Sequence, residues 1–185
     1  MQPAAIVGLA WLVFIAVWFV SALSAKRTLV RHTVGWWIRI VVIVAAVVLA
    51  SNLGRDWMRL LFIPWASAPL AWLGAALAVA GVALAIWARV YLGRNWGMPQ
   101  AVKEDPELVT TGPYALVRHP IYTGMLLAMT GSALSAGLWW AIVLVGAGSY
   151  FILSAHKEEA LMLATFPDAY RAYRARTKML VPFIF

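Results

Sequence analysis

The 185-residue sequence contains no cysteine and few charged residues. Without cysteine, disulfide bonds, thiolate nucleophiles and thiolate metal ligands are excluded. Charged residues make up only 12% of the chain, whereas hydrophobic residues make up 64%. Because polar side chains are too few to cover a water-facing surface, the composition indicates an integral membrane protein. The aliphatic content also excludes a disordered chain.

Acidic residues are scarce as well, with seven against fifteen Lys and Arg, and the net charge is +8. The basic residues cluster between long apolar runs, since none occurs before Lys26, between Arg59 and Arg89, or between Arg118 and Lys157. Such clusters are what the positive-inside rule predicts beside membrane spans. We therefore expect the lipid bilayer, and no nucleic acid, as the partner of this charge.

Uncharged runs of near the ~20 residues that cross a bilayer predict five spanning helices. Their approximate bounds are 4–23, 35–53, 69–90, 120–135 and 138–155. The last two derive from one stretch that is too long for a single span, and Gly137 followed by Trp139 marks its break. We predict a tight helical hairpin there. In the third span, Gly74 and Gly81 are small enough to let another helix approach closely.

Five spans place most of the basic residues on one side of the membrane. Twelve of the fifteen Lys and Arg fall in the first loop, in the segment from Arg89 to His119 and in the segment 154–185. The predicted orientation therefore has the N-terminus outside and the C-terminus in the cytoplasm, in a bacterial-type inner membrane. We predict a single membrane domain over residues 1–185, with both long polar segments on the cytoplasmic face.

The first polar segment ends in Arg118-His119-Pro120, at the start of the fourth span. A helix start offers free amides, and with Arg118 they favour a carboxylate or phosphate. Alternatively, Arg118 marks the membrane interface and His119 is a satisfied helix cap. We predict no metal site, because His32 and His156 have no partner at metal-binding spacing.

The second polar segment begins with Glu158-Glu159 beyond the fifth span. Consecutive helical residues point about 100° apart, so one carboxylate would serve a ligand while the other meets Lys or Arg. A solvated charged turn is the alternative. Farther on, Tyr170 and Tyr173 stand among basic residues, which predicts a C-terminal interfacial helix.

These residues carry a family resemblance. The blocks Thr111-Gly112-Pro113-Tyr114 and Arg118-His119-Pro120-Ile121-Tyr122, with the carboxylate pair and the tyrosines after it, resemble the isoprenylcysteine carboxyl methyltransferase family over roughly residues 96–185. Phospholipid N-methyltransferases of the same superfamily share much of the pattern. The resemblance implies an all-α integral membrane fold with a cytoplasmic pocket, and S-adenosylmethionine as cofactor.

The resemblance also assigns residues. The implied cofactor contacts are Gln100, Leu108, Val109, Tyr114, His119, Pro120, Tyr122 and Glu158. The chemistry of the cofactor and acceptor adds two catalytic candidates, Arg118 and Glu159. Arg118 or the start of the fourth span would meet the cofactor carboxylate, and Glu159 or a tyrosine would assist deprotonation of an amine acceptor. Tyr114 and Tyr122 would face the sulfonium through cation–π attraction.

The predicted function is methyl transfer from S-adenosylmethionine to a lipophilic acceptor, either an isoprenylcysteine-like carboxylate or another lipid. At the position where the eukaryotic enzymes have an acceptor-contacting arginine, this chain has Ser154. The alternatives are a phospholipid N-methyltransferase, a membrane reductase with a nucleotide cofactor, or a non-enzymatic membrane scaffold.

Overall fold

A computed structural model describes residues 1–22, 28–30, 66–96, 102–103 and 106–184. The helices are α1 (Pro3–Ala22), α4 (Ala68–Leu92), α5 (Pro120–Ala136), α6 (Trp139–Thr165) and α7 (Pro167–Arg176). Two short 3₁₀ helices, η1 (Gly93–Asn95) and η2 (Gly112–Ala115), lie in the connections. Strands β1 (Thr28–Val30) and β2 (Val102–Lys103) pair antiparallel. The predicted helical fold is confirmed apart from this strand pair, which is too short to leave a periodic signal in the sequence.

Four of the five predicted spans coincide with helices α1, α4, α5 and α6, while the span 35–53 lies outside the described residues. Among the described helices, α1, α4 and α6 are long and apolar enough to cross a bilayer. Their outward side chains include Phe19, which is 72% exposed, as expected of a surface that faces lipid. With 17 residues, α5 rises roughly 26 Å. That α5 crosses the bilayer therefore stays a prediction, and so does the total of five spans.

Helices α4 and α5 approach each other closely along two pairs of glycines. A Cβ atom added at Gly81 or Gly124 would lie less than 3.0 Å from backbone atoms of the facing helix. The same holds for Gly74 and Gly131, two turns farther along. The expected close approach at Gly74 and Gly81 is therefore confirmed, and α5 is its partner.

The predicted hairpin joins α5 to α6 through a two-residue connection. Gly137 has a φ of 114°, a conformation that side chains with a Cβ rarely adopt, and so the chain turns there. Helix α1 packs across α4 and α5. Its Trp11 donates a hydrogen bond from Nε1 to Ser132 Oγ at 3.0 Å and stacks on Trp140 at the start of α6.

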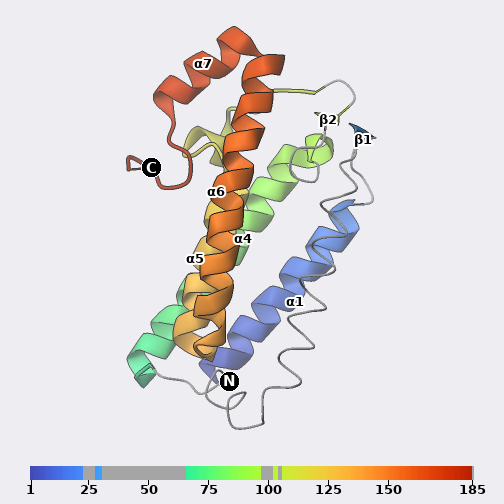
Figure 1. Ribbon diagram of the computed structural model, residues 1–185. Coiled ribbons are helices and arrows are strands. Elements are labelled where there is room, and N and C mark those ends of the chain that lie inside the picture. Colours follow the sequence, from blue (N-terminus) through green and yellow to red (C-terminus); the bar gives the residue numbers. More distant parts are fainter. Residues whose placement is uncertain (23–27, 31–65, 97–101, 104–105, 185) are drawn as a thin grey trace, which may run out of the picture.

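The polar connections gather at one end of the bundle. In Figure 1, α7 and the β1–β2 pair lie at the upper end, while the N-terminus and the α5–α6 turn lie at the lower end. Helix α6 runs past the predicted span into the upper end and carries the carboxylate pair there. Residues far apart in the sequence therefore meet at the upper end.

Candidate active site

The residues just before α5 are held by the C-terminal tail, residues 177–184. The backbone N–H of Arg118 donates to the carbonyl of Lys178 at 2.8 Å, and that of His119 donates to the carbonyl of Met179 at 3.1 Å. Met179 is buried against Ala155 of α6. The tail thus fixes the backbone of the Arg-His pair and joins it to α6.

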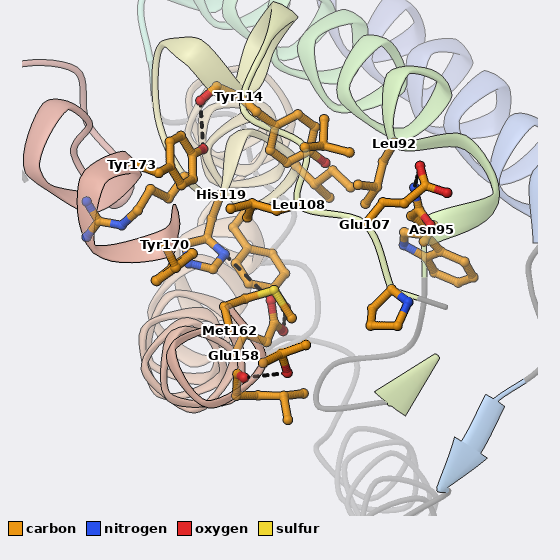
Figure 2. Close-up of a pocket in the computed structure, with 18 of the residues that line it drawn as sticks. Leu92, Asn95, Glu107, Leu108, Tyr114, His119, Glu158, Met162, Tyr170 and Tyr173 are labelled. Atoms are coloured by element: carbon orange, nitrogen blue, oxygen red, sulfur yellow. Dashed lines mark hydrogen bonds and ion pairs between the residues drawn. The ribbon is translucent and has the colours of Figure 1, made fainter. Parts of the chain in front are cut away.

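A cavity of about 370 Å³ opens at this end of the bundle. Its walls come from α1, α4, α5, α6, α7 and the segment 106–109. Figure 2 shows the cavity between two groups of side chains, with His119, Glu158, Tyr170 and Tyr173 on one side and Leu92, Asn95 and Glu107 on the other. The cavity therefore combines charged groups with apolar and aromatic walls, which is typical of small-molecule sites.

Glu159 lies behind the cavity wall and holds Arg118. The Arg118 Nε lies 2.6 Å from Glu159 Oε1, and the two side chains are only 8% and 4% exposed. Arg118 also donates to the carbonyl of Thr177 in the tail. Arg174 of α7 approaches the second oxygen of Glu159 at 3.5 Å. Glu159 is therefore a buried anchor for two cations, while Arg118 still lines the cavity.

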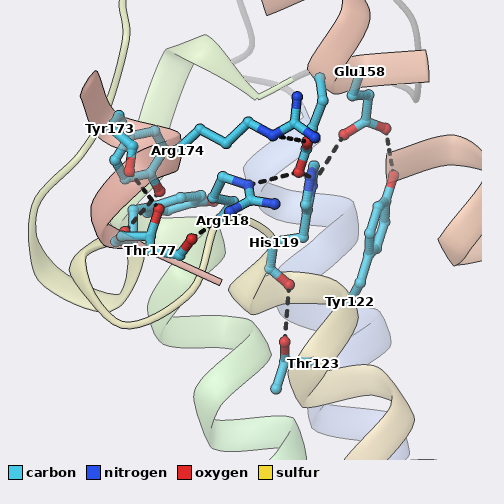
Figure 3. A network of polar contacts seen from close by, with 10 residues as sticks. Arg118, His119, Tyr122, Thr123, Glu158, Tyr173, Arg174 and Thr177 are labelled. Carbon is cyan, nitrogen blue, oxygen red and sulfur yellow. Dashed lines mark hydrogen bonds and ion pairs between the residues drawn. The ribbon is translucent and has the colours of Figure 1, made fainter. Parts of the chain in front are cut away.

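Glu158 instead faces the cavity. The Tyr122 hydroxyl donates to Glu158 Oε1 at 2.5 Å, and His119 Nδ1 lies 3.6 Å from Glu158 Oε2. Figure 3 shows the side chains of His119 and Tyr122 both pointing toward Glu158. The two rings lie parallel with centroids 5.6 Å apart, and Tyr122 stacks in turn on Phe151 of α6. The adjacent carboxylates therefore point apart: Glu159 meets arginine, as predicted for one of the pair, and Glu158 faces the cavity. The ligand role of Glu158 stays a prediction.

The charge of His119 depends on both carboxylates. Its second ring nitrogen, Nε2, lies 3.5 Å from Glu159 Oε1. Burial alone lowers the pKa of His119, but Glu158 and Glu159 outweigh burial and raise its pKa above the ordinary value. The two carboxylates therefore favour the imidazolium form of His119 more than water does around a free histidine.

Buried tyrosines close the cavity from the side of α7. The Tyr173 hydroxyl donates to the carbonyl of Tyr114 at 2.7 Å, which fixes η2 against α7. Burial raises the pKa of Tyr173 to about 12 and raises the pKa values of Tyr114 and Tyr170 further. All three phenols therefore stay neutral at physiological pH, and they supply aromatic surface without charge.

The predicted site residues separate into three groups. Those that line the cavity are Leu108, Val109, Tyr114, Arg118, His119, Tyr122 and Glu158. Pro120 and Glu159 are buried and do not line it. Gln100 lies outside the described residues. The structure thus brings together side chains from four separate stretches of the second half of the chain.

Sequence reasoning missed the contribution of the first helix. Phe14 and Trp18 of α1 line the cavity together with Trp96 and Met125. Phe14 and Trp18 are four residues apart and therefore share a helix face, which was the available signal. In a helix that is apolar on all sides, that face does not stand out.

The family comparison identifies this arrangement. The family model of phospholipid methyltransferases matches residues 70–169, from α4 to the start of α7. The chain belongs to this family. The match covers more than half of the sequence and includes Arg118, His119 and both carboxylates.

Individual relatives agree with this assignment. The chain is 35% identical over 83 residues to a methanethiol S-methyltransferase of Pseudomonas sp., covering 44% of this chain and 31% of the relative. It is 32% identical over 104 residues to the protein-S-isoprenylcysteine O-methyltransferase of Schizosaccharomyces pombe, covering 52% of this chain and 43% of the relative. The chain thus spans less than half the length of both. The resemblance to isoprenylcysteine carboxyl methyltransferases is confirmed.

The fold has a counterpart among solved structures. The eukaryotic intramembrane Ras methyltransferase ICMT superposes with a TM-score of 0.56 and 24% sequence identity. The superposition covers 84% of this chain and 55% of the other. The chain is therefore an integral membrane protein with the fold of ICMT. Its cofactor and acceptor have to be inferred from the residues that line the cavity.

Proposed function

We propose that this protein is an S-adenosylmethionine-dependent methyltransferase that acts on a lipophilic acceptor at the cytoplasmic face of the membrane. The observation that carries the proposal is one cavity that combines Glu158, His119 and Arg118 with buried tyrosines and apolar walls. Family membership supports methyl transfer as the reaction. The charge distribution of the sequence supports the cytoplasmic face.

The residues present fit the chemistry of the cofactor. Its ribose and ammonium need an acidic acceptor, and Glu158 offers one at the cavity wall beside Tyr122 and His119. Its carboxylate needs a cation, which Arg118 supplies from the cavity wall. Its adenine needs apolar surface, as at Leu108 and Val109. Tyr114 is neutral and buried, and offers an electron-rich face to a sulfonium.

When bound, the cofactor supplies an activated methyl group for in-line displacement, and the task left to the protein is alignment. Arg118 and Glu158 lie at fixed positions through the contacts with Glu159 and Tyr122. The stacked rings of Tyr122 and Phe151 exclude water from one wall. Glu159 acts through Arg118 and His119 and does not line the cavity, so we propose it as a positioning residue rather than as a base.

The test is calorimetric titration of the purified full-length protein in nanodiscs with S-adenosylmethionine and S-adenosylhomocysteine. We expect saturable binding that weakens about tenfold or more in Glu158→Gln and in His119→Ala, because charge-assisted hydrogen bonds are lost. Asp168→Asn is the matched control, since this carboxylate on α7 is exposed. Its affinity should equal that of the wild type.

Two outcomes would contradict the proposal. Folded protein that binds neither sulfur compound removes the methyltransferase assignment. Binding of a reduced nicotinamide dinucleotide in their place would favour a membrane reductase. If Glu158→Gln retains full affinity while the wild type binds, the cofactor is right and the role of Glu158 is wrong.

A further inference from the structure

The cavity has a second, aromatic end that the proposed cofactor chemistry does not use. Phe14 and Trp18 of α1, Trp96 after α4 and Met125 of α5 line it. Phe14 and Trp18 stack with ring centroids 4.6 Å apart, and Trp18 meets Trp96 edge to face at 5.7 Å. These four side chains carry no formal charge. The aromatic end is therefore suited to an apolar group rather than to the charged parts of the cofactor.

Phe14 closes this end. Its ring lines the cavity, yet the residue is only 8% exposed because it packs on Val82, Ala85 and Ala128 of α4 and α5. Beyond it stands Trp11, whose ring meets Phe14 edge to face at 5.4 Å. Within the described residues the space past Phe14 is thus filled by close-packed side chains.

Both tryptophans of this wall are fixed. Arg89 of α4 is 1% exposed and lies 4.4 Å from the Trp96 ring and 6.0 Å from the Trp18 ring. It donates to the carbonyl of Ser21 at the end of α1 and to that of Gly93 at 2.9 Å. Arg89 therefore ties the end of α1 to α4. A wall held in this way resists displacement by a bulky ligand.

The available volume is small. At about 370 Å³, the cavity is near the lower end of the roughly 300–1,000 Å³ found for single small-molecule sites. A nucleoside cofactor at the charged end leaves room for only a limited apolar group beside it. A long isoprenoid or acyl chain would have to displace Phe14.

We infer that Phe14, Trp18, Trp96 and Met125 form the acceptor subsite, with Phe14 as its floor, and that the acceptor is a small or short-chain lipophile. This inference rests on the proposed function and adds the substrate class. It makes Phe14 a specificity-determining residue. It also gives α1 a role in acceptor selection.

The test uses the absence of cysteine from the chain. Met125→Cys places a single thiol in the aromatic end, and Phe19→Cys places one on the lipid-facing side of α1 as the matched control. Both full-length variants in nanodiscs react with methyl and dodecyl methanethiosulfonate. Dividing the rates for Met125→Cys by those for Phe19→Cys removes the effect of reagent partitioning into lipid.

We expect the normalised rate of the methyl reagent to exceed that of the dodecyl reagent by about tenfold or more. Adding Phe14→Ala to Met125→Cys should reduce this methyl-to-dodecyl ratio to about threefold or less. Saturating S-adenosylhomocysteine should leave the methyl rate unchanged. Because Phe14→Ala removes core packing, Phe14→Leu serves as a milder variant with an intermediate ratio. Titration of each variant with S-adenosylhomocysteine verifies its fold.

Each other outcome contradicts the inference in a recognisable way. Equal normalised rates for both reagents remove the length limit. Protection of the thiol by S-adenosylhomocysteine assigns the aromatic end to the cofactor. A ratio that Phe14→Ala and Phe14→Leu leave unchanged means that Phe14 is not the floor. If the wild type binds no S-adenosylhomocysteine, the proposed function fails and the acceptor assignment fails with it.

Discussion

At the scale of single residues, Glu158 and Glu159 are chemically identical neighbours with different environments. Glu159 is 3% exposed and meets Arg118 and Arg174, whereas Glu158 faces the cavity beside Tyr122. The helical offset of consecutive residues predicts this division. The identity of the outward residue was not predictable from that offset alone, because it depends on where α5 and α7 pack. The family resemblance assigned Glu158 to the ligand side.

Glu159→Gln should destabilise the protein strongly. The substitution leaves Arg118 buried without its carboxylate, and breaking a buried ion pair costs about 3–5 kcal/mol. Arg174→Ala is the control, because that arginine is 52% exposed and contributes at most about 1 kcal/mol. Unfolding in mixed detergent micelles measures both. Equal losses in the two variants would mean that Glu159 is not an anchor.

His119 should make stability depend on pH. Its pKa is raised in the folded protein, because the carboxylates of Glu158 and Glu159 outweigh burial. The folded state therefore keeps a proton that the unfolded chain releases near pH 6.5. This contribution is fully present below about pH 6.5. It is lost as the pH rises through the raised pKa.

To check this dependence, the free energy of unfolding is measured from about pH 6 to 9 at constant ionic strength. This range begins near the ordinary histidine pKa of about 6.5. His119→Gln should remove most of the decline above neutrality. His156→Gln, at an exposed position on α6, should retain it. A decline that survives in His119→Gln belongs to another group.

At the scale of helices, the apolar runs predict α1, α4 and the α5–α6 hairpin with bounds that differ by a few residues, except that α6 continues past the predicted end of its span to Thr165. Hydrophobicity fixes such elements because every backbone polar group must be satisfied within a helix in lipid. The pairing of helices was harder to predict. The glycines of α4 indicate a close neighbour, but only the matching glycines of α5 identify which helix it is.

Gly81→Ala should therefore weaken the α4–α5 contact. Its added Cβ would lie less than 3.0 Å from backbone atoms of Gly124 and Ala128, so the helices must separate. We expect a loss of about 1–3 kcal/mol, the usual cost of overpacking. Gly146→Ala on α6 is the matched control, because no atom lies within 4 Å of its added Cβ. Because Ala favours a helix more than Gly does, the Gly146→Ala variant should be as stable as the wild type or slightly more stable. A loss of equal size there would mean that the α4–α5 contact is not the cause.

At the scale of the whole molecule, the charged end of the site is completed by parts of the chain that lie far apart. The tail carbonyls of Lys178 and Met179 fix Arg118 and His119, and Thr123 donates to the carbonyl of Leu180 at 2.6 Å. Sequence motifs identify the residue types here, since the motif blocks are local. They do not reveal the aromatic end from α1, because contacts between distant helices leave no local pattern.

Orientation in the membrane is the remaining property at this scale. The charged end of the cavity lies with the C-terminal tail, whose carbonyls accept from the backbone of Arg118 and His119. Most basic residues fall in the segments that we place on that side. The positive-inside rule then predicts that the cavity opens to the cytoplasm. Five spans also require the two termini to lie on opposite sides.

Single cysteines in the cysteine-free chain measure the orientation directly. Gln2→Cys and Phe183→Cys are both at exposed positions, and Phe183 is 95% exposed. A membrane-impermeant maleimide applied to intact spheroplasts should label Gln2→Cys at once and Phe183→Cys only after lysis. The reverse pattern would place the cavity on the outer face and contradict the cytoplasmic assignment. Labelling of both from outside would require an even number of spans, because only an even number brings the two ends to one side.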